Sequence, residues 1–148
     1  MARVEKSIEI NAAPERVWPM ISWEKVPEWY APFKKVEHVS GEKNKVGETV
    51  RIIGEIAGVK ADWNAENTEV IENEKAAWRT SGGNFTGFGV TALTSTKAGT
   101  KVTQTMDYDL PYSYLGKLID KLRVHKAMEN SFDVGLNKLK DMIEKQGM

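Results

Sequence analysis

Several residue types that would narrow the function are scarce or missing from this sequence of 148 residues. It has no cysteine, which excludes disulfides and thiol catalysis and argues against a structural zinc site. Its only histidines, His38 and His125, have no metal-type spacing with a carboxylate cluster, so we predict no metal and no cofactor. The lack of cysteine is compatible with a cytoplasmic location, which we expect.

Excess charge and long apolar runs are also missing. Lys and Arg total 21 and Asp and Glu total 21, and basic residues alternate with acidic ones, so no nucleic-acid partner is predicted. No apolar run approaches the roughly 18 residues that cross a bilayer, and residues 1–6 lack a signal core, so we expect no integral membrane segment. Nothing in the sequence identifies a protein partner.

The residues that are present have the periods of a mixed α and β protein. Residues 3–10 alternate between polar and apolar, which predicts a strand. Pro14 suits the first turn of a short helix, and residues 23–30 suggest a second short helix or turn. The absence of a linker or repeat predicts one domain spanning residues 1–148.

The middle of the chain has the pattern of an antiparallel meander. Turn-rich breaks, such as Gly82-Gly83-Asn84, separate short runs of strand-forming residues. Gly87 and Gly89 mark places where the sheet is expected to bend. The predicted strands are 34–40, 48–57, 59–71, 75–81, 84–96 and 100–110.

After Pro111 the period changes to that of an amphipathic helix, predicted from about Ser113 to Lys145. At 1.5 Å per residue it would be roughly 50 Å long and would cross a whole sheet. We therefore predict an α+β fold, with a seven-stranded antiparallel sheet curved around a long C-terminal helix and two short helices after strand 1. Gly135 inside this helix costs about 1 kcal/mol relative to alanine, so it is predicted to be buried against the sheet or an N-terminal helix.

Three stretches resemble the START-like (SRPBCC) superfamily, in its polyketide cyclase/dehydrase and lipid-transport branch. They are residues 8–18, residues 99–103 with 108–111, and residues 135–144. The resemblance implies a helix-grip fold with a cavity between sheet and helix. It also implies many activities, from lipid or quinone carriage and hormone binding to polyketide cyclisation and co-chaperone work, among which a fold cannot choose.

Two polar residues interrupt the apolar stripe of the long helix. At about 100° per residue, His125 and Glu129 lie within roughly 30° of the centre of the stripe that Leu122 and Phe132 define. Four residues apart, they can contact each other. Either they face a partly hydrated cavity, as ligand anchors or as an acid–base pair, or the helix overhangs the sheet and both face water.

Large apolar residues and one amide suggest the walls of a pocket, although ordinary core packing explains each of them equally well. Gln104 is the polar member of its strand face and would bind either a ligand carbonyl or hydroxyl, or a neighbouring side chain. A cluster of aromatic residues around Pro27 forms either a lid or the packing of the short helices: Trp23, Trp29, Tyr30 and Phe33. The predicted ligand-binding residues are Trp63, Trp78, Phe85, Gln104, Met106, Tyr108, Leu118, Leu122, His125 and Glu129.

The leading hypothesis is a protein that binds or transports a hydrophobic small molecule, such as a lipid, a quinone or an aromatic, polyketide-like compound, in an internal cavity. A second hypothesis is a cyclase, aromatase or dehydratase that uses His125 and Glu129 as its acid–base pair. A third is a co-chaperone-like protein-binding module, which requires an exposed apolar patch and a filled interior.

Overall fold

The computed structural model describes residues 2–109 and 121–146. Seven strands form one antiparallel sheet in the order β1-β7-β6-β5-β4-β3-β2, so the first strand closes against the last and β1 and β2 are the edges. This confirms the predicted sheet. The strands are β1 (Ala2–Ile10), β2 (Phe33–Ser40), β3 (Thr49–Ile56), β4 (Val59–Ile71), β5 (Lys75–Gly83), β6 (Thr86–Ser95) and β7 (Thr100–Asp109).

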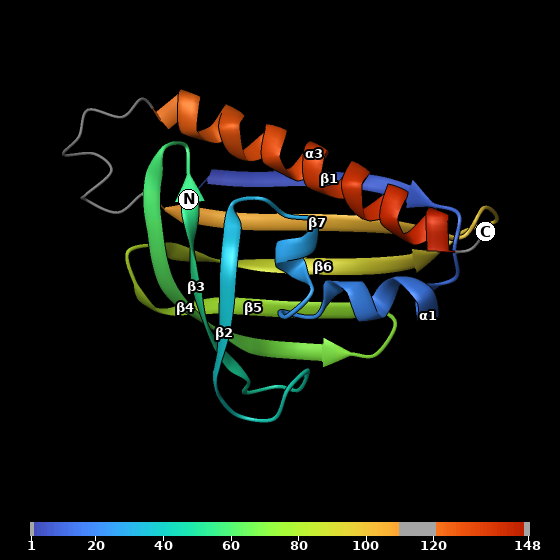
Figure 1. The fold of residues 1–148 in the computed structure, drawn as a ribbon, viewed down its shortest axis with the longest axis horizontal. Coiled ribbons are helices and arrows are strands. Elements are labelled where there is room, and N and C mark those ends of the chain that lie inside the picture. Colours follow the sequence, from blue (N-terminus) through green and yellow to red (C-terminus); the bar gives the residue numbers. More distant parts are fainter. Residues whose placement is uncertain (1, 110–120, 147–148) are drawn as a thin grey trace.

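Short helices connect β1 to β2, and one long helix follows the sheet. They are α1 (Pro14–Val17), the 3₁₀ turns η1 (Trp18–Ile21) and η2 (Val26–Glu28), and α3 (Lys121–Gln146). In Figure 1, β2 and β3 cross the direction of β6 and β7 steeply, and α3 lies along β1, as the helix-grip arrangement requires. The predicted helix start near Ser113 lies outside the described residues.

The inner face of the sheet consists of the buried side chains, which alternate with exposed ones along the strands. In β3 the buried residues include Val50, Ile52 and Ile56, and in β4 they include Ala61 and Trp63. Since successive side chains of a strand point to opposite faces, each strand places every second residue in the core. The predicted strand ends agree with the observed ends to within two residues.

The buried face of α3 corrects one sequence prediction. Leu122 is 59% exposed, whereas Val124 and Met128 are fully buried in line with Phe132. The predicted stripe through Leu122, His125 and Glu129 is therefore one residue out of register. Steps of four residues back from Phe132 lead to Met128 and then to Val124. The observed rotation of α3 therefore turns these apolar side chains towards the sheet and keeps His125 and Glu129 out of the core.

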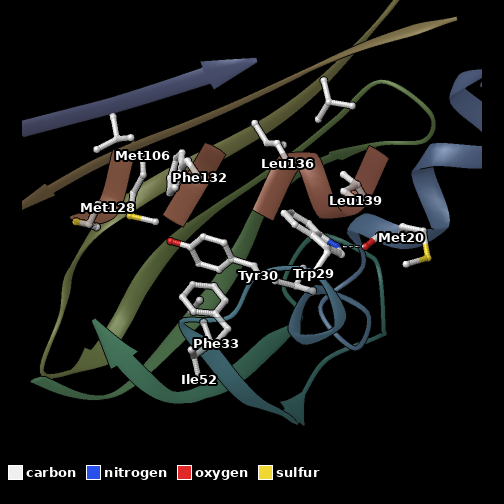
Figure 2. Packing of buried hydrophobic residues seen from close by; sticks show 14 of the residues in the cluster. Met20, Trp29, Tyr30, Phe33, Ile52, Met106, Met128, Phe132, Leu136 and Leu139 are labelled. Atoms are coloured by element: carbon white, nitrogen blue, oxygen red, sulfur yellow. Dashed lines mark hydrogen bonds between the residues drawn. The ribbon is translucent and has the colours of Figure 1, made fainter. Parts of the chain in front are cut away.

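Aromatic residues between the short helices and α3 fill the centre of the molecule (Figure 2). The Tyr30 ring contacts Phe33 edge-on at 4.8 Å between centroids and Phe132 at 5.7 Å. The Trp29 indole N–H donates a hydrogen bond of 2.8 Å to the backbone oxygen of Met20, so no buried donor is left unpaired there. These contacts join α3 to residues 18–30, which contain η1, η2 and the turn after them and are called the η1–η2 segment below.

Gly135 lies where that segment meets α3, which confirms that it is buried against the N-terminal part of the chain. A Cβ atom built on it would lie 3.1 Å from the Tyr30 ring and 3.2 Å from the backbone oxygen of Trp29. Glycine therefore permits the close approach of helix and turn, which outweighs its poor helix propensity.

Candidate functional site

A cavity of about 260 Å³ lies between the inner face of the sheet and the η1–η2 segment. The segment covers one side of it with the indoles of Trp18, Trp23 and Trp29. Pro19 within η1 and Pro27 within η2 restrict the backbone of this cover, because proline fixes φ near −65°. Core packing accounts for part of the aromatic cluster around Pro27, since Trp29, Tyr30 and Phe33 belong to the buried core. Trp23, Trp29 and Phe33 also line the cavity, and a role as a lid stays a prediction.

The opposite wall is formed by three neighbouring strands. Ala76 of β5 pairs with Thr91 of β6, and Thr91 pairs with Gln104 of β7, so these three side chains lie side by side on the wall. Met106 and Trp78 extend the same wall. Except for the Thr91 hydroxyl and the Gln104 amide, this surface is apolar.

The position of the Trp78 ring depends on a glycine in the neighbouring strand. Gly89 is paired with Trp78, and a Cβ atom built on Gly89 would lie 2.7 Å from the indole. A side chain there would displace the ring, since real Cβ atoms do not approach other atoms so closely. Trp78 also contacts Trp23 edge-on at 5.8 Å between centroids, which joins the wall to the cover.

Gln104 holds an unpaired acceptor in this wall. Its side-chain Oε1 is buried and has no hydrogen-bond partner among the described residues. By contrast, the Trp23 indole N–H donates to Oδ1 of Asn67 at 2.7 Å, so that donor of the cavity lining is already used. The cavity wall therefore combines indole rings with a residue whose buried side-chain oxygen is unpaired.

A second cavity, of about 170 Å³, adjoins the first, and Trp23, Glu24 and Asn44 line both. Beside it, the buried Glu48 carboxylate is bonded to His38 Nδ1 at 2.9 Å and accepts the Asn44 backbone N–H at 2.9 Å. The Glu48 carboxylate therefore holds the loop between β2 and β3 next to Trp23, which lines both cavities.

The structure divides the predicted ligand-binding residues into groups. Trp78, Gln104 and Met106 line the larger cavity. Trp63, Phe85 and Tyr108 are buried but line neither cavity, and instead fill the interior beside it as a row of rings with centroids 5.1 Å and 6.1 Å apart. Leu122 is exposed, as described above, and Leu118 lies outside the described residues.

His125 and Glu129 lie at the end of this row of rings, and neither lines the two cavities. His125 Nε2 is 3.4 Å from Glu129 Oε1, which confirms that the two side chains interact, and their side chains are 29% and 40% exposed. His125 Nδ1 is hydrogen-bonded to the Tyr108 hydroxyl at 3.0 Å. Burial raises the pKa of the Tyr108 phenol and the Glu129 carboxylate raises it further, so the phenol stays protonated.

Sequence reasoning did not assign the cover of the cavity to the binding site. Trp18 is not among the predicted binding residues, and Trp29 is predicted only as part of either a lid or the packing of the short helices. The available signal was the density of aromatic residues around Pro19 and Pro27.

Two classes of feature are missing from the described residues. Within residues 2–109 and 121–146, no group of three or more histidine or carboxylate side chains is arranged to hold a metal ion. In the same part of the chain, no helix has the length and apolar character that spanning a membrane requires.

The sequence and the fold are both similar to those of known proteins. Residues 1–144 match the family described as polyketide cyclase/dehydrase and lipid transport. An uncharacterized 17.2 kDa protein from the melC2-rnhH intergenic region of Streptomyces lincolnensis is 28% identical over 149 residues, covering 99% of this chain and 93% of that protein.

Solved structures with low sequence identity share the fold. TTHA0849 from Thermus thermophilus has a TM-score of 0.81 and 23% identity, with 99% of this chain and 100% of that chain covered. The Zhui aromatase/cyclase from Streptomyces sp. R1128 has a TM-score of 0.80 and 16% identity, covering 99% and 96%. A START superfamily protein from Mycobacterium smegmatis has a TM-score of 0.79 and 16% identity, covering 97% and 98%. With a family match over residues 1–144, the chain belongs to the polyketide cyclase/dehydrase and lipid transport family.

Proposed function

We propose that this protein binds a hydrophobic small molecule in the cavity between the η1–η2 segment and the sheet. The observation that supports this function is the cavity itself, a partly open concave space between the η1–η2 segment and the sheet, with room for a small molecule. Most of its lining residues are aromatic or aliphatic, and the polar ones are Ser22, Glu24, Lys25, Asn44, Asn67, Thr91 and Gln104. Apolar walls with a limited set of polar groups are usual in ligand pockets.

The cavity volume favours a compact ligand. An apolar cavity of about 150 Å³ holds one benzene molecule, and the volume here is about 260 Å³. A ligand of one or two fused rings fits such a space, whereas a two-chain lipid does not. Among the ligands suggested by the sequence, the aromatic class therefore agrees best with the structure.

Naphthalene is a suitable test ligand because it has two rings and no polar group. We expect isothermal titration calorimetry to detect its binding to the wild-type protein. In Ala76→Phe, the added ring occupies the cavity wall, and binding should be lost. Thr94→Phe is the matched control, since it adds the same ring at an exposed position of β6.

Thermal melts establish whether both variants are folded. If Ala76→Phe is unfolded, Thr91→Met replaces it as the variant that blocks the cavity. Wild-type protein that fails to bind naphthalene, or a folded blocking variant that binds it as well as wild type, would show that the cavity is not the binding site.

A second candidate function is catalysis of the cyclase, aromatase or dehydratase type. It is supported by the hydrogen bond between Tyr108 and His125 and by the contact of 3.4 Å between His125 Nε2 and Glu129 Oε1. A general acid–base pair must come within hydrogen-bond reach of the reacting group, and this pair lines neither cavity. Binding is therefore the leading function.

His125→Leu separates the two candidates. For a binding protein we expect naphthalene affinity to stay within about twofold of wild type, because His125 does not line the cavity. For an enzyme, product formation from a polyketide-like substrate should be abolished while binding persists. The co-chaperone alternative requires a filled interior, so binding of naphthalene in the cavity would contradict it.

A further inference from the structure

The unpaired acceptor of Gln104 points to the chemical class of the ligand, and this inference rests on the proposed binding function. A buried acceptor without a partner costs about 1–3 kcal/mol, so native proteins rarely keep one without a reason. Gln104 Oε1 is such an atom among the described residues, and it belongs to a residue of the cavity wall. An incoming donor would remove this cost.

Two of the four indole donors of the cavity lining are engaged elsewhere, and the other two, of Trp18 and Trp78, do not donate to Gln104 Oε1. The Trp23 indole N–H is bonded to Asn67, and the Asn67 amide donates in turn to the backbone oxygen of Lys45 at 3.2 Å. The Trp29 indole N–H is bonded to Met20. Within the described part of the chain, the other buried unpaired atom is Trp63 Nε1, but Trp63 does not line the cavity.

The Gln104 amide can turn towards the cavity. No hydrogen bond within the described residues holds its side-chain oxygen, and rotation about the last bond of glutamine is broad and inexpensive. Its neighbours along the strand face, Val102 and Met106, are apolar and do not compete for the amide. A ligand that enters the cavity can therefore receive the amide oxygen at small cost.

The surroundings restrict which donor can bind there. Gln104 is paired with Thr91 of β6 and with Lys6 of β1. The Lys6 ammonium lies 3.7 Å from the Glu129 carboxylate and 3.4 Å from that of Asp133, so its charge is already paired. The charged residues of the cavity lining, Glu24 and Lys25, belong to the η1–η2 segment and not to this wall. An ammonium group at Gln104 would therefore lie near the Lys6 cation, and a carboxylate would meet an acceptor. A neutral hydroxyl is the donor that suits this wall, and the indole walls suit an aromatic ring.

We propose that the ligand is a neutral hydroxylated aromatic compound whose hydroxyl group donates a hydrogen bond to the side-chain oxygen of Gln104. Three probes of nearly the same shape test this: naphthalene has no polar group, 2-methoxynaphthalene has an acceptor only, and 2-naphthol has a donor. Wild-type protein should bind 2-naphthol about tenfold more tightly than 2-methoxynaphthalene, as expected for one additional buried hydrogen bond.

Gln104→Met keeps the length of the side chain and removes the acceptor. In this variant the preference for 2-naphthol over 2-methoxynaphthalene should disappear, while naphthalene affinity is retained or improved. Thr105→Val is the matched control, because it removes a hydroxyl from the next residue of β7, which points to the other face of the sheet and lines neither cavity, so the preference should remain. Gln104→Ala replaces Gln104→Met if thermal melts show the latter to be unfolded.

The outcomes distinguish this inference from the proposed function. If naphthalene binds but wild-type protein does not prefer 2-naphthol, the assignment of the hydroxyl donor is wrong and the binding function stands. A preference that survives Gln104→Met, or that is lost in Thr105→Val, shows that Gln104 is not the partner. If naphthalene does not bind at all, both the function and the inference are overturned.

Discussion

Replacing Gly135 with alanine tests how closely α3 packs on the η1–η2 segment. Alanine improves helix propensity by about 1 kcal/mol. Its methyl group, however, would lie 3.1 Å from the Tyr30 ring and 3.2 Å from the Trp29 backbone oxygen. Tyr30 is fully buried between Phe33 and Phe132, so it cannot move aside easily.

The two contributions have opposite signs, and the structure indicates which is larger. Overpacking of a filled core typically costs about 1–3 kcal/mol. The expected net effect of Gly135→Ala is a loss of about 1 kcal/mol in the free energy of unfolding. For a protein of this length that lowers Tm by about 3 °C.

Calorimetry or urea unfolding measures this change, and a neighbouring residue is the control. Val134 is exposed on the same turn of α3, so Val134→Ala improves helix propensity without adding contacts. We expect Val134→Ala to raise Tm by about 1 or 2 °C, on the order of the propensity difference. An increase for Gly135→Ala as well would refute the close packing of helix and turn.

Two further predictions concern the cavity wall and the dependence of the free energy of unfolding on low pH. Gly89→Ala should displace the Trp78 indole, which lowers the free energy of unfolding by about 1–3 kcal/mol and weakens naphthalene binding. If calorimetric titration finds the naphthalene affinity unchanged, the position of the ring is not critical for binding. Hydrogen bonds from the Asn11 backbone N–H and the Lys140 ammonium lower the pKa of the Glu144 carboxyl in the folded protein. The ionised carboxylate therefore stabilises the fold above the unfolded-state pKa, and this stabilisation is lost as pH falls through the lower folded-state pKa. Urea unfolding should therefore find Glu144→Gln less stable than wild type at neutral pH, with the difference closing below about pH 4; a constant difference would contradict this linkage.

Much of the fold could be predicted because local patterns determine it. Alternation along the strands identified the seven strands and their short turns, as in Val50, Ile52 and Ile56 of β3. The poor fit of glycine to a helix interior was enough to predict that Gly135 is buried. Family membership was also accessible, since the stretches that carry it lie at both ends of the chain.

The rotation of α3 was predicted wrongly because the helical period allows two registers on the N-terminal side of Phe132. Counting back from Phe132 by three leads to Glu129, and counting back by four leads to Met128. Helical period allows either, since 3.6 lies between them. The cost of burying His125 and Glu129 decides the register, and that cost exists only once the helix is packed against the sheet.

The sequence by itself determined the strand order along the chain, the long helix and the presence of large aromatic residues for a core or a pocket. Only the tertiary structure decided which of those residues surround empty space: Trp78 lines the cavity, whereas Trp63 and Phe85, with the same apolar character, fill the interior beside it. A pattern of residues specifies which side of a strand faces inward. Whether that side meets another ring or a void depends on contacts between distant segments, here between the η1–η2 segment and β5, β6 and β7.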